Sequence, residues 1–407
     1  MNNITIHRAL WVVPVSHPAI PDGAVAVQNK RILNVGGYND LITRHPGSIV
    51  KEHAGSVLLP PLVNAHIHLE LSHICIPKLH KTVTGFTSWI NKLLDTRERY
   101  GAIGDLAEKA ARDTLMQQYG HGVVALGDIG NTDFIEQFTN DFPGSMLHFN
   151  EVLGRSSKSR RSILERVAQA EKTKMFTAHA PYSTHAELIK ALKQRARTLG
   201  HPFPIHVAES QSESELLNHG SGELYEFLIQ RGFIDKSFEP PAAIDNPGSV
   251  QYLNTLGVLD KQTICVHCIH VSSEEIEILA ETKTNVCLCP GSNRYLNVGR
   301  APVKQFLDHD LLPALGTDST ASNPELSIWR EMRLLKEDHP EVRASDIFSM
   351  ATSGGAAVLG LDKDYGTLEK GKKAQLLAVM LPGEIQNPDV LFDILVTDNK
   401  GIKPVWV

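Results

Sequence analysis

Two histidines stand in a His-x-His arrangement at the end of an apolar run that begins at Leu58. Successive side chains on a β-strand point to opposite faces, so the imidazoles of His66 and His68 project from the same face. Two neutral imidazole nitrogens on one face are typical ligands of a transition metal. Surface histidines also show this spacing, and the metal interpretation therefore depends on further ligands elsewhere in the chain.

Further ligand candidates follow other apolar runs, which we interpret as strands. The strand-like runs cover residues 57–65, 122–127, 146–150, 175–178, 203–205, 263–266, 284–288 and 312–316. The side chains at their carboxyl ends that can bind a metal or transfer a proton are His66, His68, His179, His206, His267 and Asp318. Imidazoles together with a carboxylate form a mixed nitrogen and oxygen shell that suits Zn²⁺ or Fe²⁺ and leaves a position for water.

Helical patterns lie between these strands. Examples are residues 103–119, 162–172, 185–199 and 273–281. Repeated strand–helix units of this kind build a (β/α)8 TIM barrel, in which the carboxyl ends of all eight strands face one active site. The sequence therefore predicts an α/β fold whose main domain is a barrel over residues 58–359.

Short strand-like runs also occupy both ends of the chain. They cover residues 4–15, 23–27, 31–35 and 47–52 at one end, and 374–380, 391–397 and 404–407 at the other. Pro-Asp-Gly and Gly-Gly turns separate several of them. Since neither group is large enough to close a sheet alone, we expect one small composite β-sandwich built from residues 1–57 and 360–407.

The composition limits the partners and the compartment. Of 407 residues, 42% are hydrophobic and 21% are charged, which is ordinary for a globular protein. The net charge is −6 and no basic stripe is present, which argues against nucleic acid as a partner. No run approaches the ~18 apolar residues that a membrane span needs. We therefore expect neither a nucleic-acid nor a membrane partner.

Cysteine usage points to a reducing compartment. The five cysteines are odd in number and lie mostly in apolar runs, so we interpret them as reduced core residues. The apolar run near the N-terminus lacks a small-residue cleavage site, and we expect no signal peptide. These features predict a cytoplasmic protein. They leave the oligomeric state open, with a homodimer as one arrangement.

Several segments together resemble a known family. They are Pro61-Leu-Val-Asn-Ala-His-Ile-His68, His179-Ala-Pro-Tyr-Ser183, His206-Val-Ala-Glu209, Val266-His267-Cys268, Pro290-Gly-Ser-Asn293 and Leu315-Gly-Thr-Asp318-Ser-Thr-Ala-Ser-Asn323. As a set they resemble the metal-dependent amidohydrolase superfamily in its nucleoside- and base-deaminase branch. The resemblance implies a barrel enzyme that replaces an amino group on a heterocycle with an oxo group and releases ammonia.

The resemblance also implies roles for individual residues. The metal ligands would be His66, His68, His206 and Asp318, holding one divalent metal, with zinc expected and iron as the alternative. Glu209 would protonate a ring nitrogen of the substrate, and His267 would help to activate the attacking water, with Asp318 accepting its proton. Because Glu209 follows His206 by three residues, it can leave the strand and reach across the mouth of the barrel.

The expected substrate is a small heterocyclic nucleoside. Within the branch, residues 64–72, 86–90, 127–129 and 150–154 are most similar to the aminodeoxyfutalosine deaminases of menaquinone biosynthesis. Deaminases of methylthioadenosine and S-adenosylhomocysteine share residues 321–323 and 331–333 and are the alternative, followed by guanine deaminases and triazine hydrolases. The predicted substrate contacts are His179, Glu70, Trp89 and Ser319. Glu98, Asp128 and Arg155 are left without a role.

Three other classes fit the sequence less well. A two-metal amidase needs a bridging lysine at the end of the fourth strand, where this chain has His179, while Lys174 lies at the opposite end. A non-catalytic relative would have lost ligands that are all present here. A cytidine-type deaminase needs a Pro-Cys-x-x-Cys motif, but Ile264 precedes Cys265. The one-metal deaminase interpretation is therefore favoured.

Overall fold

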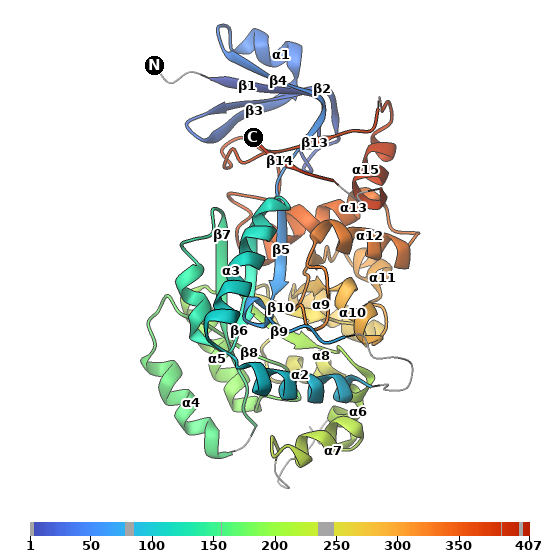
Figure 1. Cartoon of the computed structure of the whole chain (residues 1–407). Helices are drawn as coiled ribbons and strands as arrows, with labels where there is room; N and C mark the ends of the chain where they lie inside the picture. The colour runs from blue at the N-terminus through green and yellow to red at the C-terminus, as the bar shows by residue number, and fades with distance from the viewer. Residues whose placement is uncertain (1–3, 78–84, 156, 235–247, 384, 399–401) are drawn as a thin grey trace.

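The computed structural model describes residues 4–77, 85–155, 157–234, 248–383, 385–398 and 402–407 (Figure 1). Its centre consists of two parallel sheets, each of four described strands, with the orders β5-β6-β7-β8 and β12-β11-β10-β9. The strands are β5 (Leu62–Ile67), β6 (Val123–Gly130), β7 (Ser145–Val152), β8 (Met175–Ala178), β9 (Phe203–Val207), β10 (Thr263–His267), β11 (Asn285–Leu288) and β12 (Ala314–Leu315). Nearly all of their residues are buried, as expected for strands covered on both faces.

The two parallel sheets are joined at both edges. Between β8 and β9, the backbone N–H of His206 donates to the carbonyl of His179 at 2.9 Å. Between β12 and β5, the N–H of Thr317 donates to the carbonyl of His66 at 2.9 Å, and Ile67 forms a parallel bridge with Asp318. Together with the strand order, these links make a closed ring, and the predicted (β/α)8 fold is confirmed.

A glycine permits the closure beside the site. A Cβ atom placed on Gly316 would lie 2.6 Å from the Cβ of His66, closer than real Cβ contacts. The backbone after β12 therefore approaches β5 so closely that only glycine fits. This close approach sets the spacing between His66 on β5 and Asp318, which follows the neighbouring strand β12.

Helices surround the barrel (Figure 1). Those that follow or flank its strands are α2 (Phe86–Tyr100), α3 (Asp105–Gly120), α4 (Ser157–Gln169), α5 (Ala186–Leu199), α6 (Gln211–His219), α7 (Glu223–Gln230), α8 (Ser249–Thr255), α9 (Ser273–Thr282), α10 (Pro290–Leu296), α11 (Val303–Asp308), α12 (Ile328–Asp338), α13 (Ala344–Ser349) and α14 (Gly355–Val358). Short 3₁₀ segments η1 (Leu69–Leu71) and η2 (Asp133–Phe138) and a π-helical segment η3 (Met350–Gly354) complete this part. No helix in the described ranges is long and apolar enough to cross a bilayer.

The two chain ends meet in one further sheet, shown away from the barrel mouth in Figure 1. In the described residues it has six strands in the order β14-β13-β4-β1-β2-β3. The strands are β1 (Thr5–Val12), β2 (Ile20–Gln28), β3 (Arg31–Gly37), β4 (Ile49–Leu59), β13 (Leu377–Met380) and β14 (Val405–Trp406), with helix α1 (Tyr38–Arg44) after β3. The expected composite β domain is thus built from both ends, but the described strands form a single sheet, whereas the prediction was a sandwich of two packed sheets. The exact domain boundaries stay predictions.

Two of the predicted strands were wrong. The run at residues 57–65 is divided, because Pro60 and Pro61 have no N–H to donate; β4 ends before them and β5 begins at Leu62. Residues 391–397, predicted as a strand, belong to helix α15 (Pro388–Thr397). The side chain of Asn387 accepts from the N–H of Asp389 at 2.8 Å, and proline occupies the first turn, so the capping signals outweighed the apolar run.

The prediction of reduced core cysteines is confirmed for four of the five and wrong for Cys75, which is exposed. All five cysteines are free thiols; Cys75 is exposed, and Cys265, Cys268, Cys287 and Cys289 are buried. The buried thiols lie on or next to β10 and β11 in the apolar core. They act as small core side chains.

Candidate active site

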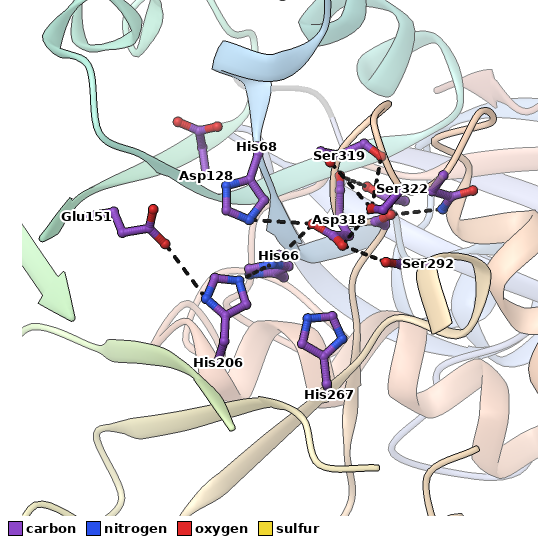
Figure 2. A network of polar contacts seen from close by, with 12 residues as sticks. His66, His68, Asp128, Glu151, His206, His267, Ser292, Asp318, Ser319 and Ser322 are labelled. Carbon is purple, nitrogen blue, oxygen red and sulfur yellow. Dashed lines mark hydrogen bonds and ion pairs between the residues drawn. The ribbon is translucent and has the colours of Figure 1, made fainter. Parts of the chain in front are cut away.

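The predicted ligands converge at the carboxyl ends of the barrel strands (Figure 2). His66 lies on β5 and His68 just after it, His206 lies on β9, and Asp318 follows β12. All four side chains are buried. Parallel strands end at the same rim of a barrel, so residues far apart in the chain come together here.

Their ligand atoms are spaced as a metal shell requires. The Nε2 atoms of His66 and His206 are 3.3 Å apart, and Asp318 Oδ1 lies 3.5 Å from Nε2 of His68 and 3.8 Å from Nε2 of His66. Four ligands at bond lengths of about 2.0–2.2 Å around a tetrahedral ion lie about 3.3–3.6 Å from one another. The donor set and its spacing therefore fit one divalent metal.

Neighbouring groups orient the ligands. Nδ1 of His206 lies 2.9 Å from the carbonyl of His179 and donates to it, which leaves Nε2 with a free lone pair. Asp318 Oδ2 accepts from the hydroxyls of Ser292 at 2.6 Å and Ser322 at 2.7 Å, which leaves Oδ1 for the cluster (Figure 2). The carbonyl thus leaves Nε2 of His206 available to a metal, and the two serines leave Oδ1 of Asp318 available.

The protonation states agree with metal binding. Burial lowers the pKa of His68 to about 3 and that of His206 well below its ordinary value, so both imidazoles are neutral near pH 7. Burial would raise the pKa of Asp318, but the imidazoles of His66 and His68 hold it well below the usual value. Neutral imidazoles and an ionised carboxylate are the forms that bind metals.

Two further groups face the ligands, Glu209 just after β9 and His267 at the end of β10. Oε1 of Glu209 lies 3.6 Å from Nε2 of His267, and both lie in one cluster with Asp318. Nδ1 of His267 is 3.1 Å from Oδ1 of Asn293, which fixes the ring so that Nε2 faces the cluster. Burial, and next the charge of Asp318, raises the pKa of Glu209 well above its ordinary value. Burial therefore favours the protonated form of Glu209, which is the form that can donate a proton.

Three residues at the carboxyl ends of these strands have left-handed backbone angles. The φ angles of Ala208, His267 and Asp318 are 52°, 75° and 60°. Non-glycine residues in this region each cost about 1–3 kcal/mol and often occur at functional sites. The left-handed turns direct Glu209, His267 and Asp318 inward at the strand ends.

A buried carboxylate that sequence reasoning missed supports one of these turns. Glu213, on α6, is fully buried and accepts from the N–H of Ala208 at 3.0 Å, the N–H of Glu209 at 3.1 Å and the hydroxyl of Ser249 at 2.6 Å. Burial raises its pKa to about 7. The sequence signal that could have indicated this contact is the spacing of four residues between Glu209 and Glu213.

The cluster opens into a cavity of about 180 Å³. One wall is apolar and is formed by Phe86, Trp89, Ile90 and Leu94 of α2 with Phe227 and Leu228 of α7. The predicted substrate residues His179, Glu70, Trp89 and Ser319 all line this cavity. The structure therefore brings them together, and their contact with a substrate stays a prediction.

Glu70 has its own protein partners in the cavity wall. Its Oε1 lies 3.1 Å from Nη2 of Arg97, and its Oε2 accepts from the N–H of Asn131 at 3.0 Å and from the hydroxyl of Thr132 at 2.5 Å. Arg97, which sequence reasoning missed, also lines the cavity. Glu70 thus positions a cation at the wall.

Trp89 joins α2 to the chain that follows Asp318. Its Nε1–H donates to the carbonyl of Ala321 at 3.0 Å, and Ser319 Oγ lies 3.4 Å from the hydroxyl of Ser322. Since Ser322 also donates to Asp318, the apolar wall and the metal cluster share one loop.

The three residues without a predicted role lie in different surroundings. Asp128 accepts from the N–H of Leu69 at 2.8 Å and lies 2.6 Å from Nδ1 of His148, so it supports the chain after His68. Glu98 is exposed on α2. Arg155 donates to the carbonyl of Pro181 at 2.5 Å, and burial lowers its pKa to about 10.

The chain is similar to a known protein family and to individual proteins of known name. Residues 57–407 match the model of the amidohydrolase family. The chain is 29% identical over 385 residues to a 5-methylthioadenosine/S-adenosylhomocysteine deaminase of Moorella thermoacetica, which covers 90% of this chain and 83% of that protein. It is 28% identical over 402 residues to an aminodeoxyfutalosine deaminase of Nitratiruptor, which covers 95% and 94%.

Solved structures include a similar fold. The Helicobacter pylori aminofutalosine deaminase in complex with methylthio-coformycin superimposes with a TM-score of 0.82 at 23% identity. The match covers 98% of this chain and 97% of that one. At this level of identity the likeness concerns the fold alone.

Proposed function

The chain belongs to the amidohydrolase family, and we propose that it is a metal-dependent hydrolase that deaminates an adenine nucleoside. The reaction adds water at C6 and releases the 6-amino group as ammonia, which leaves a 6-oxo product. The observation that carries the proposal is the buried group of three imidazoles and one carboxylate beside the acid Glu209. The names of the two deaminase relatives support the nucleoside class.

One divalent metal fits the shell of His66, His68, His206 and Asp318. When bound there, it would supply Lewis acidity and bring the pKa of a water to about 7. We propose zinc, with iron as the alternative, because the shell mixes imidazole with carboxylate. The remaining chemistry is proton transfer by side chains of the chain.

Glu209 begins the proton transfers. Held protonated by burial, it donates to the ring nitrogen next to the amino-bearing carbon, which interrupts ring delocalisation and makes that carbon electrophilic. We assign to His267 the orientation of the attacking water through Nε2, and to the carboxylate of Asp318 the acceptance of its proton. Transfer of that proton to the amino group makes ammonia the leaving group, and the proton of the added hydroxyl returns to Glu209 as the 6-oxo group forms.

We propose aminodeoxyfutalosine as the substrate within this class. The relative with that name matches almost the whole length of both proteins. The apolar wall from α2 and α7 suits an aromatic substituent, and Arg97 provides a cation near that wall for an attached carboxylate. The product would then be futalosine, which belongs to menaquinone biosynthesis.

The alternative within the class is methylthioadenosine or S-adenosylhomocysteine. It is favoured by the Moorella relative, whose identity to this chain is as high. Methylthioadenosine would use the same apolar wall without needing Arg97. The two substrates therefore differ in what Arg97 contributes.

Ammonia release across a panel of substrates tests the proposal. We expect deamination of aminodeoxyfutalosine with a kcat/KM well above those of methylthioadenosine, S-adenosylhomocysteine and adenosine. A kcat/KM for methylthioadenosine or S-adenosylhomocysteine that equals or exceeds it would select the alternative. Release of ammonia from guanine or a triazine, with none from any adenine nucleoside, would overturn both readings.

A further inference from the structure

Glu151 presents a buried carboxylate to the cavity that the mechanism above does not use. It lies on β7, it is only 7% exposed, and it lines the cavity together with His179 and His206. Figure 2 shows its carboxylate facing His206. Its Oε2 lies at the limit of a hydrogen bond, 3.5 Å from Nδ2 of Asn131. No described residue donates a hydrogen bond to Oε1.

The nearest nitrogen does not satisfy Oε1. Nδ1 of His206 lies 3.7 Å from this oxygen, beyond hydrogen-bond distance, and donates instead to the carbonyl of His179 at 2.9 Å. A buried acceptor without a donor is costly, whereas a donor entering the cavity would remove that cost. Oε1 is therefore an acceptor that is available to a ligand.

His179 offers a second acceptor next to it. The hydroxyl of Ser183 donates to the carbonyl of Ala180 at 3.3 Å and so accepts from Nδ1–H of His179 at 2.6 Å. Because Nδ1 is the donor to Ser183, Nε2 is the ring nitrogen of His179 that can accept a hydrogen bond. Ligand atoms of Glu151, His179 and His206 lie within 4.8 Å of one another.

A second cation explains this group less well than a donor does. His206 uses Nδ1 for the carbonyl of His179 and has Nε2 directed at His66, so it has no nitrogen left for another ion. One carboxylate and one imidazole would remain, fewer than the three protein ligands of a catalytic zinc site. Two adjacent acceptors match a ligand that carries two neighbouring hydroxyls.

We infer that Glu151 accepts a hydrogen bond from a hydroxyl of the substrate's sugar, beside His179, whose substrate contact the family resemblance already implies. The inference rests on the proposed function, since it requires a nucleoside. With Glu209, His267 and Asp318 taking the reacting edge of the base, the sugar extends toward β7 and β8, where both acceptors lie. Glu151 is thereby a specificity-determining residue for ribose.

The test compares an adenine nucleoside with its 2′-deoxy and 3′-deoxy analogues. The wild-type enzyme should favour the ribonucleoside over at least one analogue by about tenfold, because the deoxy analogue leaves the buried Oε1 of Glu151 without a donor. Glu151→Ala should reduce that ratio to within about threefold, mainly by slowing the ribonucleoside. Glu151→Gln, which keeps an acceptor oxygen, should give an intermediate ratio.

A matched control and the metal content separate this role from others. Glu136→Gln changes a carboxylate on η2 that binds Nδ2 of Asn150 and does not line the cavity, so it should keep the wild-type ratio. Metal analysis of Glu151→Ala should give the wild-type value. An unchanged ratio in Glu151→Ala, or loss of metal from it, would overturn the inference while the proposed function stands. A wild-type enzyme that acts only on sugar-free bases would overturn both.

Discussion

The Nε2 atoms of His66 and His206 lie 3.3 Å apart, although the two residues come from different four-stranded sheets of the barrel. Both rings are buried and neutral, because burial lowers the pKa of each below its ordinary value. Two lone pairs directed at one point form a cation site only if the whole barrel is assembled.

We expect one divalent metal per chain, and we expect His66→Ala to lose it. Removal of the metal by a chelator should lower the Tm, because a ligand at a hundredfold excess over its Kd stabilises the folded state by about 2.7 kcal/mol. Elemental analysis and thermal unfolding measure both effects. His17→Gln, at an exposed histidine, is the control. Two tightly held metals per chain, with activity proportional to the second, would contradict the prediction.

Glu209→Gln should lower kcat by about 10² or more and leave the metal content unchanged, since general acids contribute roughly 10²–10⁴. The physical reason is that the amide cannot donate the proton that the buried carboxyl holds. Steady-state kinetics with metal analysis provide the measurement. Glu215→Gln, on the exposed face of α6, should behave as wild type. A kcat within about threefold of wild type, well short of that range, would exclude the role.

Glu213→Gln should weaken the turn that carries Glu209. A glutamine side chain has one acceptor oxygen, so the N–H of either Ala208 or Glu209 loses its partner. We expect the free energy of unfolding to fall by about 1–3 kcal/mol and kcat to fall more than KM rises. Denaturant titration and kinetics test both. A stability loss with an unchanged kcat would show that Glu213 does not position Glu209.

Acidification should destabilise the six-stranded sheet through His7. Burial, and next the neighbouring His53, lowers its pKa from 6.5 to about 4, and Nδ1 of His7 lies 3.1 Å from Nε2 of His53. Between these pH values the unfolded chain takes up a proton that the folded chain excludes. The neutral His7 side chain therefore contributes fully to the free energy of unfolding above pH 6.5, and this contribution is lost as the pH falls toward 4.

His7→Gln isolates this effect. The amide does not titrate, so the unfolding free energy of the variant should depend less steeply on pH between 4 and 6.5 than that of the wild type. His17→Gln should retain the wild-type slope, because that side chain is exposed. Equal slopes for the wild type and His7→Gln would contradict the assignment.

The sequence predicted the parts of the site that depend on local period and strand ends. His66 and His68 share a face because the strand repeat is two, and His206, His267 and Asp318 follow apolar runs that did become strands. The same reasoning missed contacts that depend on which strands become neighbours. Glu151 lies beside His206 only because β7, β8 and β9 are consecutive in the ring.

Local capping also limited the prediction. Residues 391–397 read as a strand by hydrophobicity, but Asn387 and Pro388 begin a helix, whose buried face is formed by Leu391, Leu395 and Val396. Glu213 gave no apolar signal at all. Its role follows from the left-handed Ala208, whose N–H turns back toward α6, and a backbone angle of this kind is not visible in a residue type other than glycine.

The pairing of β13 with β4 affects the order in which the chain acquires structure during synthesis. Leu377 lies opposite Leu59, and β4 leads through two prolines into the strand that bears His66. Because β4 is synthesised more than 300 residues before β13, their sheet stays incomplete until β13 has been made, and such long-range pairings form slowly. We expect nascent chains released before β13 to be protease-sensitive in residues 49–59, and a chaperone that holds them would raise the yield of active enzyme.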